Sequence, residues 1–489
     1  MLQKLAGQTA IYGVSTIVSR LLSYALAFYF THVMTTAEYG VITDLYALIP
    51  LLLVLLTMGM EVGYFRFAGQ AQTEAEKRDI FQTTWGAVSL AAGLFFIGVA
   101  LFHRPLARVM EYDDFPSYVL LMAAIVAIDA ATAIPFARLR QEGKAAHYVV
   151  ARITSVVITV LLTVFFFSVV PHLGGLSEII PAAYGPGYYL LANLIASAAM
   201  FFLLRPAIRG YVPKIDKPLV RIIFLYSLPL LVSGIAGVAN EFIDRQFIKY
   251  LLPPDLALSS LGIYGAVTKI GVILLLFVQM YRIAAEPFFL SGFKHEEFVQ
   301  ANAEAMKFFF IVSITLFLGI ALFYDLFGLL LGADFRQGMY ILPIVLLANI
   351  FSGAILNLSF WYKKSGKTQF AIVVTGTGLL ITVMLNLIFI PRMGYVGAAW
   401  ARLICEAAMV AVSYALCRHF FPIPYDWRRI GGYFLLGAVL YGAGVAAREW
   451  LPHLALAYVA NLGLIAIFVG YAAKREGIAP RKYFKKFRR

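Results

Sequence analysis

Runs of about twenty residues without a charge recur along the whole chain, and they limit the possible folds more than any other feature. A helix of about 20 apolar residues spans the hydrocarbon core of a bilayer, which is roughly 30 Å thick. Only 13% of the residues are charged, against about 25% in a soluble globular protein, and the mean hydropathy is +0.82. The alternating segments of about ten residues that mark a membrane β-barrel are not visible. The sequence therefore predicts an all-α polytopic membrane protein.

We expect about 14 transmembrane helices, joined by short connections with no soluble domain between them. Residues 1–4 lead into a hydrophobic stretch too long for a signal peptide, so the first helix is expected to be retained. The two longest connections, residues 205–220 and 291–307, are expected to be amphipathic or surface segments. The predicted spans are residues 9–32, 42–66, 80–103, 117–138, 147–170, 183–204, 220–248, 258–287, 305–331, 339–362, 368–390, 394–417, 430–449 and 453–473.

The positive charges predict how these spans are oriented. With the N-terminus inside, 28 of the 40 Lys and Arg residues fall in inner segments and six in outer loops, Lys249 among the six. Cytoplasmic loops carry such an excess, so both termini are predicted to be cytoplasmic. The same bias explains the net charge of +14, and no nucleic-acid partner is expected. The basic and aromatic tail, residues 481–489, is expected to contact anionic membrane lipids.

The chain contains an internal duplication. Residues 20–65 read as two apolar helices joined by a turn at residues 35–40, and the arrangement returns 225 positions later, with seven of 46 aligned residues identical. The identical residues include charges that lipid excludes, because Arg20 aligns with Arg245 and Glu61 with Glu286. Residues 192–200 also match residues 401–409 at six of nine positions.

These offsets place helices 1 and 2 on helices 7 and 8, and helix 6 on helix 12. An even number of helices per repeat gives both halves the same orientation about an axis along the membrane normal. We therefore expect two pseudo-symmetric six-helix lobes plus two extra C-terminal helices. The predicted parts are an N-lobe (1–204), a cytoplasmic linker (205–219), a C-lobe (220–418), helices 13 and 14 (419–474) and a basic cytoplasmic tail (475–489).

No hydrolase triad, nucleotide-binding loop, zinc cluster or dinucleotide motif occurs, so we expect neither an enzyme nor a metal or cofactor site. Cys405 and Cys417 are expected to be ordinary apolar side chains. What stands out instead is charge inside the predicted spans. A basic side chain at the bilayer centre costs roughly 2.5–3.5 kcal/mol, so such residues are expected to face protein or a water-filled cavity.

Four of these residues, Arg20, Arg245, Lys269 and Arg282, would attract an anion and are the predicted substrate-binding residues. Arginine suits phosphate because its planar fork donates two parallel hydrogen bonds and keeps its charge when partly desolvated. Arg20 lies about 16 Å into the first helix, near mid-membrane. The alternative is structural, with Arg20 paired to Glu61 on the next helix. Other pairs at i,i+4 spacing are Glu241–Arg245, Arg282–Glu286 and Arg402–Glu406.

The acidic and amide side chains in the spans are candidates for gating or coupling. Asp244 and Asn240 would remain as oxygen ligands for a cation or proton if Glu241 neutralised Arg245. Asn349, Asn357 and Asn386 would either complete such a site or link helices by hydrogen bonds. The other gating or coupling candidates are Glu61, Asp129 and Glu286, and Asp129 is expected to be protonated or paired with a base across the cavity. Without an ATP-coupling motif, transport is expected to use sodium ions, protons, the membrane potential or the substrate's own gradient.

Three motifs resemble a known family. They are LAGQTAIYG (residues 5–13), EYG (38–40) and GYVGAAWA (394–401). In this order they are similar to the polysaccharide-biosynthesis flippases of the MOP exporter superfamily, the Wzx-type proteins, and the resemblance covers essentially the whole chain. It implies two six-helix lobes around a central cavity and alternating access between the two sides of the bacterial inner membrane.

The resemblance also implies a substrate: an undecaprenyl-pyrophosphate-linked oligosaccharide, moved from the inner to the outer leaflet without bond chemistry. Implied partners are the polysaccharide polymerase or glycosyltransferases of the same pathway. The related alternatives are a lipid II flippase, which shares the 14-span plan, and a cation-coupled multidrug exporter, usually of twelve spans. A membrane glycosyltransferase or polymerase, from another class, usually needs a sizeable loop or domain with acidic metal-binding motifs, which this sequence lacks.

Overall fold

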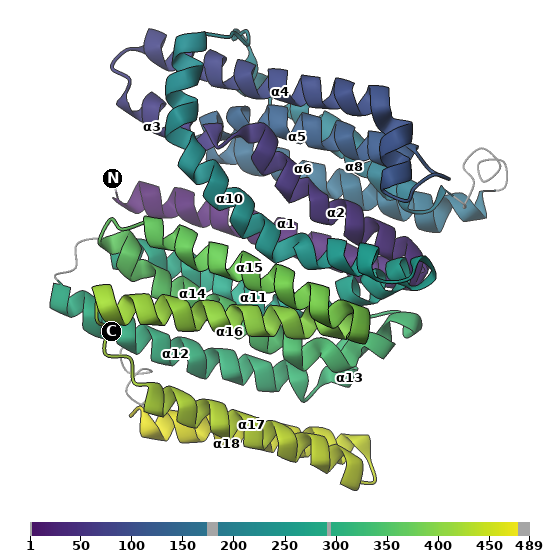
Figure 1. Ribbon diagram of the computed structural model, residues 1–489, viewed down its shortest axis with the longest axis vertical. Coiled ribbons are helices and arrows are strands. Elements are labelled where there is room, and N and C mark those ends of the chain that lie inside the picture. Colours follow the sequence, from purple (N-terminus) through teal and green to yellow (C-terminus); the bar gives the residue numbers. More distant parts are fainter. Residues whose placement is uncertain (1, 174–183, 291–294, 478–489) are drawn as a thin grey trace. The chain divides into compact units, whose positions relative to one another are not determined.

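The computed structural model describes residues 2–173, 184–290 and 295–477, and these residues form helices and turns without a strand (Figure 1). Thirteen helical segments among them are long and apolar enough to cross a membrane. Helix α1 (Leu2–Val33) is a fourteenth long helix. The prediction of an all-α, multi-pass membrane protein with about 14 long helices is confirmed.

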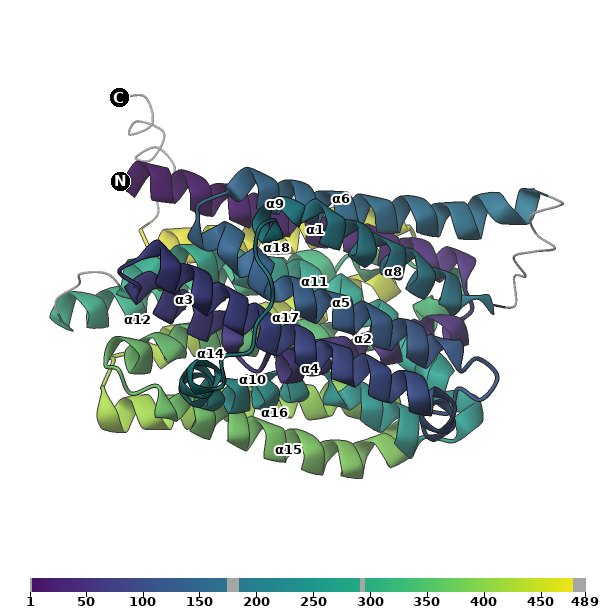
Figure 2. The same ribbon diagram turned by 90° about the horizontal axis from the view of Figure 1, so that it is seen from above.

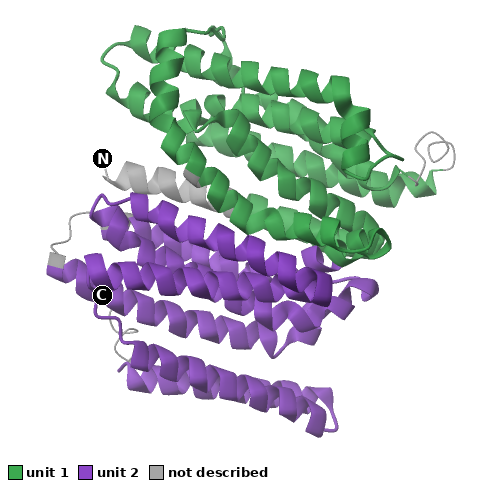
Figure 3. Cartoon of the chain, in the orientation of Figure 1, with its two compact units in different colours: residues 1–262 green, residues 263–489 purple. Residues whose placement is uncertain are grey.

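The chain divides into two compact units, residues 1–262 (unit 1) and 263–489 (unit 2), shown in Figure 3. Helix α10 belongs to unit 1, where it packs along α2 and α3. The division into lobes by sequence repeat, with its boundary at residues 204–220, stays a prediction. The helices of unit 1 are α1, α2 (Thr36–Thr57), α3 (Met60–Gln70), α4 (Glu74–Val109), α5 (Ser117–Gln141), α6 (Ala145–Val164), α8 (Pro186–Leu203), α9 (Arg205–Ile208) and α10 (Lys217–Leu251).

Unit 2 holds the rest of the chain. Helix α11 (Pro254–Leu290) begins in unit 1 and continues into unit 2 as one helix. Most long helices run roughly parallel or antiparallel to one another within each unit (Figure 2), whereas the first part of α10 runs across the other long helices of unit 1 (Figure 1). The further helices of unit 2 are α12 (His295–Ala321), α13 (Tyr324–Gly328), the 3₁₀ segment η4 (Ala333–Ile341), α14 (Leu342–Lys364), α15 (Gln369–Met393), α16 (Tyr395–Phe420), α17 (Trp427–Trp450) and α18 (Leu454–Arg475).

The connection between α1 and α2 is shorter than predicted. The expected turn at residues 35–40 is wrong, because α2 already begins at Thr36. Thr35 is its N-cap: the Thr35 side chain accepts a hydrogen bond from the backbone N–H of Glu38, whose carboxylate accepts one from the backbone N–H of Thr35. This capping box satisfies donors at the start of the helix, so the helix can begin directly after Thr35.

The predicted span 42–66 is broken in the middle. Met58 and Gly59 both adopt left-handed backbone angles, with φ of 52° and 67°, and they separate α2 from α3. A left-handed residue ends a helix because it cannot continue the hydrogen-bond ladder. Helix α3 then lies close against α10, since a Cβ on Gly63 would come within 2.5 Å of Ile223.

The ninth span also differs from the prediction. Helix α12 covers residues 295–321 rather than 305–331, and it ends where Phe323 leaves the helical conformation. Residues 295–307 therefore extend this long helix. Phe298, Asn302 and Met306 are buried there while Glu296, Glu297 and Glu304 are exposed, which agrees with the predicted amphipathic segment; residues 291–294 lie outside the described residues. The other long connection, residues 205–220, begins with the short helix α9, and residues 209–216 after it are not helical. Its Lys214 backbone N–H donates to the Gln82 carbonyl of α4 at 3.1 Å.

The two C-terminal helices, α17 and α18, pack on α12 within unit 2 and are tied to it by polar contacts. Lys307 lies 2.5 Å from Glu476, whose side chain is 4% exposed and also accepts a hydrogen bond from Tyr433 at 2.6 Å. Burial alone would raise the pKa of Glu476, but the hydrogen bonds from Lys307 and Tyr433 lower it below its usual value. Toward the opposite end of α17, Arg448 pairs with Asp325.

Candidate functional site

Arg20 lies half-buried on α1 in unit 1. Among the residues that the structure describes, no carboxylate lies within ion-pair distance of Arg20. Its helical neighbour Tyr24, one turn on, lies within electrostatic reach of both Arg20 and Glu241 of α10. The alternative prediction of a structural Arg20–Glu61 pair is wrong, because Glu61 binds another residue.

Glu61 pairs with Arg140 in the last turn of α5. Both side chains are more than one third exposed, and the Arg140 guanidinium also lies 5.0 Å from the centre of the Phe65 ring. This is the end of unit 1 that holds the α3–α4 and α5–α6 connections, which the sequence predicts to be cytoplasmic. Sequence spacing could not reveal this pair, because its members lie 79 positions apart.

Glu142, in the α5–α6 connection at the same end, is the acceptor of two basic residues. It lies 2.6 Å from Arg138 and 2.7 Å from Lys144. Burial raises the pKa of this carboxyl, but the hydrogen bonds and positive charges of Lys144 and Arg138 outweigh burial and lower the pKa. This carboxylate therefore stays ionised at neutral pH and fixes the end of α5.

Arg245 and Asp244 form a pair on α10. The Arg245 Nη1 lies 3.1 Å from Asp244 Oδ1 and donates to the backbone carbonyl of Glu241 at 3.0 Å. Arg245 therefore contacts the backbone carbonyl of Glu241, and the carboxylate that pairs with Arg245 is that of Asp244 rather than the predicted Glu241. Asp244 is buried, with a side chain 5% exposed, while Asn240 lies half-buried one turn before it. Asp244 is thus compensated by a cation in this state and is not left with Asn240 alone.

Asp129 on α5 accepts a hydrogen bond from Ser197 of α8 at 2.8 Å. Arg152 lies within electrostatic reach of Asp129, and the Arg152 guanidinium lies 5.2 Å from the centre of the Phe136 ring. Asn193, one turn before Ser197, contacts Tyr46 of α2. The structure thus gives Asp129 a hydroxyl partner, and its predicted gating role remains a prediction.

In unit 2 the candidate residues lie along α11. Lys269 is half-buried, whereas the Arg282 side chain is 52% exposed. Glu286 lies 2.6 Å from Lys363 of α14 and 3.4 Å from Arg282, so the predicted Arg282–Glu286 pair is present and Lys363 is the nearer partner.

The three candidate asparagines of unit 2 each donate a hydrogen bond. Asn349 of α14 donates to the Gly271 carbonyl of α11 at 2.9 Å, and Asn357 contacts Tyr281 of the same helix. Asn386 donates to the Thr382 carbonyl of its own helix at 2.7 Å. Asn349 and Asn357 therefore link helices, which favours that alternative over a shared cation site.

Glu61–Arg140 in unit 1 and Glu286–Lys363 in unit 2 are equivalent. In each unit a glutamate of the second helix of the repeat pairs with a base in the last turn of the fourth. The two glutamates are 225 positions apart and the two bases 223. The duplication seen in the sequence is therefore also a duplication of contacts, although the base is arginine in one copy and lysine in the other.

A buried polar cluster on α2 and α10 was missed by the sequence analysis. Lys249, predicted to be in an outer loop, lies inside α10 and is only 2% exposed. Its ammonium lies 2.5 Å from Asp44 and donates to the Met110 carbonyl at 2.7 Å. Asp44, 0% exposed, also accepts hydrogen bonds from Tyr112 at 2.5 Å and Gln246 at 2.6 Å. The one sequence signal was the carboxylate of Asp44 itself, which lies inside the predicted span 42–66.

The four predicted substrate-binding residues fall in both units. Arg20 and Arg245 lie on α1 and α10 in unit 1, and Lys269 and Arg282 lie on α11 in unit 2. The prediction that all four act on one substrate stays a prediction. In the described ranges no group of three His, Cys, Asp or Glu residues is arranged to hold a metal ion.

Solved structures show which fold this is. Lipid II flippase MurJ in an inward closed conformation matches with a TM-score of 0.75, covering 95% of this chain and 99% of that one at 14% identity. An inward-facing multidrug-resistance MATE transporter of the MOP superfamily matches at 0.66, covering 85% and 95% at 14% identity. The MATE multidrug transporter DinF-BH matches at 0.62, covering 86% and 96% at 15% identity. At these identities the likeness establishes the fold.

Sequence comparison identifies the family. No curated protein sequence matches the chain. A family model described as polysaccharide biosynthesis protein matches residues 5–293, which is more than half of the chain. This agrees with the resemblance carried by the three sequence motifs and with the fold shared with MOP-superfamily transporters. The chain therefore belongs to the polysaccharide biosynthesis protein family.

Proposed function

We propose that this protein is a flippase that moves an undecaprenyl-pyrophosphate-linked oligosaccharide from the inner to the outer leaflet of the bacterial inner membrane. Family membership and a fold shared with a lipid flippase support this class of function. The observation that carries the proposal is Arg20. It is a cation near the predicted bilayer centre, half-buried, with no carboxylate partner among the described residues. A pyrophosphate group would supply the missing negative charge.

Arg245 would join this site by changing its partner. Its guanidinium now binds Asp244, and a pyrophosphate that reached it would compete for the same donors. Asp244, a buried carboxylate, would then lose this contact with Arg245, which favours the uptake of a proton or another cation there. This exchange links substrate binding to the uptake of a coupling ion at Asp244, with Asn240 one turn away as a neutral ligand.

The direction of transport follows from the orientation that the loop charges predict. With both termini cytoplasmic, the substrate would load from the cytoplasmic leaflet, where such lipids are assembled. The driving force would be a sodium or proton gradient, the membrane potential or the gradient of the substrate. Lys269 and Arg282 remain predicted substrate-binding residues, while Glu61 and Glu286 would brace α3 and α11 at the cytoplasmic end. Pathway glycosyltransferases and the polymerase would be its partners.

The test measures flipping in proteoliposomes with a fluorescent polyprenyl-pyrophosphate-linked sugar. Arg20→Gln should abolish flipping and Arg20→Lys should retain part of it, because lysine keeps the charge and loses the bidentate geometry. Arg66→Gln is the matched control, since Arg66 is an exposed arginine that lies over the Tyr226 ring in the same unit. Flipping by Arg20→Gln at the rate of the unchanged protein would contradict the proposal.

A second candidate is lipid II flipping, favoured by the match to MurJ over 95% of this chain. The same assay distinguishes the two when lipid II and an oligosaccharide-linked lipid are compared at equal concentration. Faster flipping of lipid II would replace the proposed substrate and leave the site intact. A cation-coupled drug exporter is less favoured, because the MATE structure matches a smaller share of the chain.

A further inference from the structure

A polar pocket lies at the end of unit 1 that the sequence predicts to be cytoplasmic. Its volume is about 220 Å³, and its walls come from α3, from the first two turns of α4, from the end of α5 and from the connection between α9 and α10. The α4 wall is one face of the helix, because its lining residues lie at positions 74, 77, 78 and 81. Four separate parts of unit 1 therefore surround one small space.

Tyr211, in the connection between α9 and α10, is held in the pocket wall by two arginines. The Arg138 guanidinium of α5 donates to the Ala207 carbonyl at 2.8 Å and to the Tyr211 hydroxyl at 2.6 Å, and it lies 3.8 Å from the centre of the Tyr211 ring. Arg78 of α4 donates to the Gly210 carbonyl at 3.3 Å. The pocket is therefore preformed, and a ligand would not have to order this connection in order to bind.

Positive charge exceeds negative charge around this pocket. The cations that line it or contact its carboxylates are Lys77, Arg78, Arg138 and Lys144. The carboxylates are Glu74 and Glu142, so these six side chains carry a net charge of +2. The Glu74 side chain is 88% exposed, so water screens its contact with Lys77 at 2.7 Å. An anion that entered the pocket would relieve the repulsion among the cations.

The two arginines also keep donors for such an anion. Among the described residues, Arg138 donates three hydrogen bonds and Arg78 donates one, whereas a guanidinium has five N–H groups. A phosphate monoester offers three acceptor oxygens and carries a charge of about −1.5 to −2 at neutral pH, which matches the excess positive charge. A phosphate diester or a single carboxylate carries one negative charge and matches it less well.

We propose that this pocket binds a phosphate monoester, with Lys77, Arg78 and Arg138 as donors to the phosphate oxygens. Two sources supply this chemistry at a cytoplasmic membrane surface: a soluble phosphorylated solute and the headgroup of phosphatidic acid. The described lining residues come from elements other than α1, which carries Arg20, so the two sites are separate. A bound monoester would bridge α4 and α5 beside Tyr211 and stabilise this end of unit 1. The inference does not depend on the proposed flippase function.

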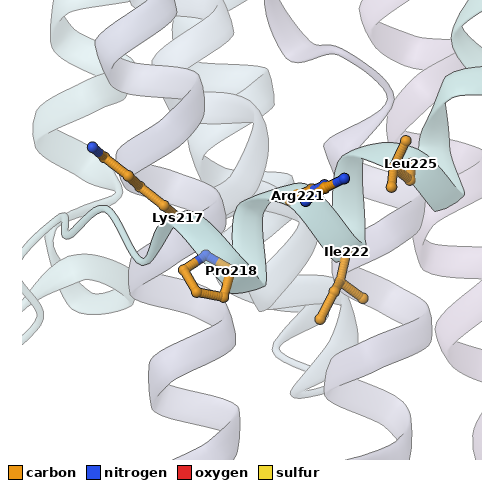
Figure 4. Close-up of a pocket in the computed structure, with 5 residues that line it drawn as sticks. All are labelled: Lys217, Pro218, Arg221, Ile222 and Leu225. Atoms are coloured by element: carbon orange, nitrogen blue, oxygen red, sulfur yellow. The ribbon is translucent and has the colours of Figure 1, made fainter.

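A second pocket, on the first turns of α10, supplies the matched control. It is lined by Lys217, Pro218, Arg221, Ile222 and Leu225 (Figure 4). All five residues belong to one helix, so its described lining includes no second element to enclose a ligand. Lys217 and Arg221 are exposed and lie outside the proposed site. Removing them therefore changes the charge of this end of unit 1 without changing the proposed site.

The experiment follows thermal unfolding of the full chain in detergent while a ligand is titrated, because a ligand that binds the folded state raises Tm by mass action. The probes are glycerol 3-phosphate, short-chain phosphatidic acid and short-chain phosphatidylglycerol. Lys77→Gln/Arg78→Gln should bind the monoester at least ten-fold more weakly, a loss of about 1.4 kcal/mol. Lys217→Gln/Arg221→Gln removes the same two charges from α10 and should bind like the unchanged chain. Arg78→Lys keeps the charge and should lose less affinity, and gel filtration checks that all variants are folded.

The outcomes decide both the site and the source of its ligand. A loss confined to Lys77→Gln/Arg78→Gln supports the proposal, with a soluble ligand if glycerol 3-phosphate binds and a lipid headgroup if only phosphatidic acid binds. No rise in Tm with either monoester would overturn the proposal, as would equal losses in the two double variants. Phosphatidylglycerol binding as tight as that of phosphatidic acid would overturn the preference for a monoester.

Discussion

The buried pair Asp44–Lys249 gives a stability prediction whose size can be worked out from the structure. Its two side chains are 0% and 1% exposed, and their charged atoms lie 2.5 Å apart. Lys249→Met keeps most of the side-chain volume and removes the cation, so Asp44 stays buried without its counter-charge. Removing one partner of a buried pair costs about 3–5 kcal/mol. Tyr112 and Gln246 still donate to Asp44, so we expect the lower end, about 3 kcal/mol.

The assay is thermal unfolding of the purified protein in detergent, followed by intrinsic fluorescence. A loss of about 3 kcal/mol corresponds to a fall in Tm of roughly 6–12 °C for a unit of this size. Asp44→Asn/Lys249→Met restores a neutral, sterically similar pair and should recover most of that loss, because replacing both members of a buried pair is often close to neutral. The matched control is Lys77→Met, since the Lys77–Glu74 pair is exposed and such pairs contribute about 0–1 kcal/mol.

Two results would refute this reasoning. One is a Tm for Lys249→Met within the error of the Lys77→Met control, which would mean that Asp44 is not charged or not buried in the folded protein. The other is a double variant whose loss equals the sum of the single variants, because coupled partners must deviate from additivity. Either result would remove the pair as the contact that anchors α10 in unit 1.

Three further predictions concern other contacts. Gly40→Val should lower Tm by an amount equivalent to about 1–3 kcal/mol, because a Cβ there would overlap the backbone oxygen of Leu258 at the start of α11, whereas an unchanged Tm would contradict this close approach. Glu61→Arg should reduce flipping and Glu61→Arg/Arg140→Glu should restore part of it; a double variant as impaired as the single one would count against the pair. Glu476 has a lowered pKa, so its pairing with Lys307 stabilises above the unfolded pKa of about 4.3 and is lost as pH falls through the folded value. The fall in Tm between pH 6 and pH 3 should therefore be smaller in Glu476→Gln, and equal curves would disprove this linkage.

The sequence predicted the helices well and their contacts poorly, for physical reasons. Apolar runs of membrane length are a local property, so the number of long helices and the multi-pass class could be predicted. Helix ends depend on a few residues, and the Thr35–Glu38 capping box was overlooked in favour of a longer turn. Short left-handed breaks such as Met58–Gly59 leave little trace in a hydrophobic run.

The partners of charged side chains depend on packing rather than on spacing along the chain. The sequence around a lysine near the end of an apolar run, such as Lys249, does not show whether its ammonium reaches water or a buried carboxylate. The carboxylate partner of Lys249 is Asp44, 205 positions earlier in the chain. Glu61 had a nearer sequence candidate in Arg20, but it pairs with Arg140. Repeat symmetry was the better guide, because it correctly placed Glu61 and Glu286 in equivalent surroundings.

The break at Met58–Gly59 makes the two halves of the duplication mechanically unequal. The helical hydrogen-bond pattern is interrupted at these two left-handed residues, so α2 and α3 are two separate helices joined by a two-residue connection. Lys249 contacts Asp44 of α2 and Arg140 contacts Glu61 of α3, so the two helices have separate polar partners. In the second copy Gly59 is replaced by Ala284, which disfavours positive φ, and α11 stays unbroken through that point. A change in the angle between the two parts of the duplicated helix therefore requires no broken helical hydrogen bonds in the first copy, whereas in the second it would have to bend a continuous helix.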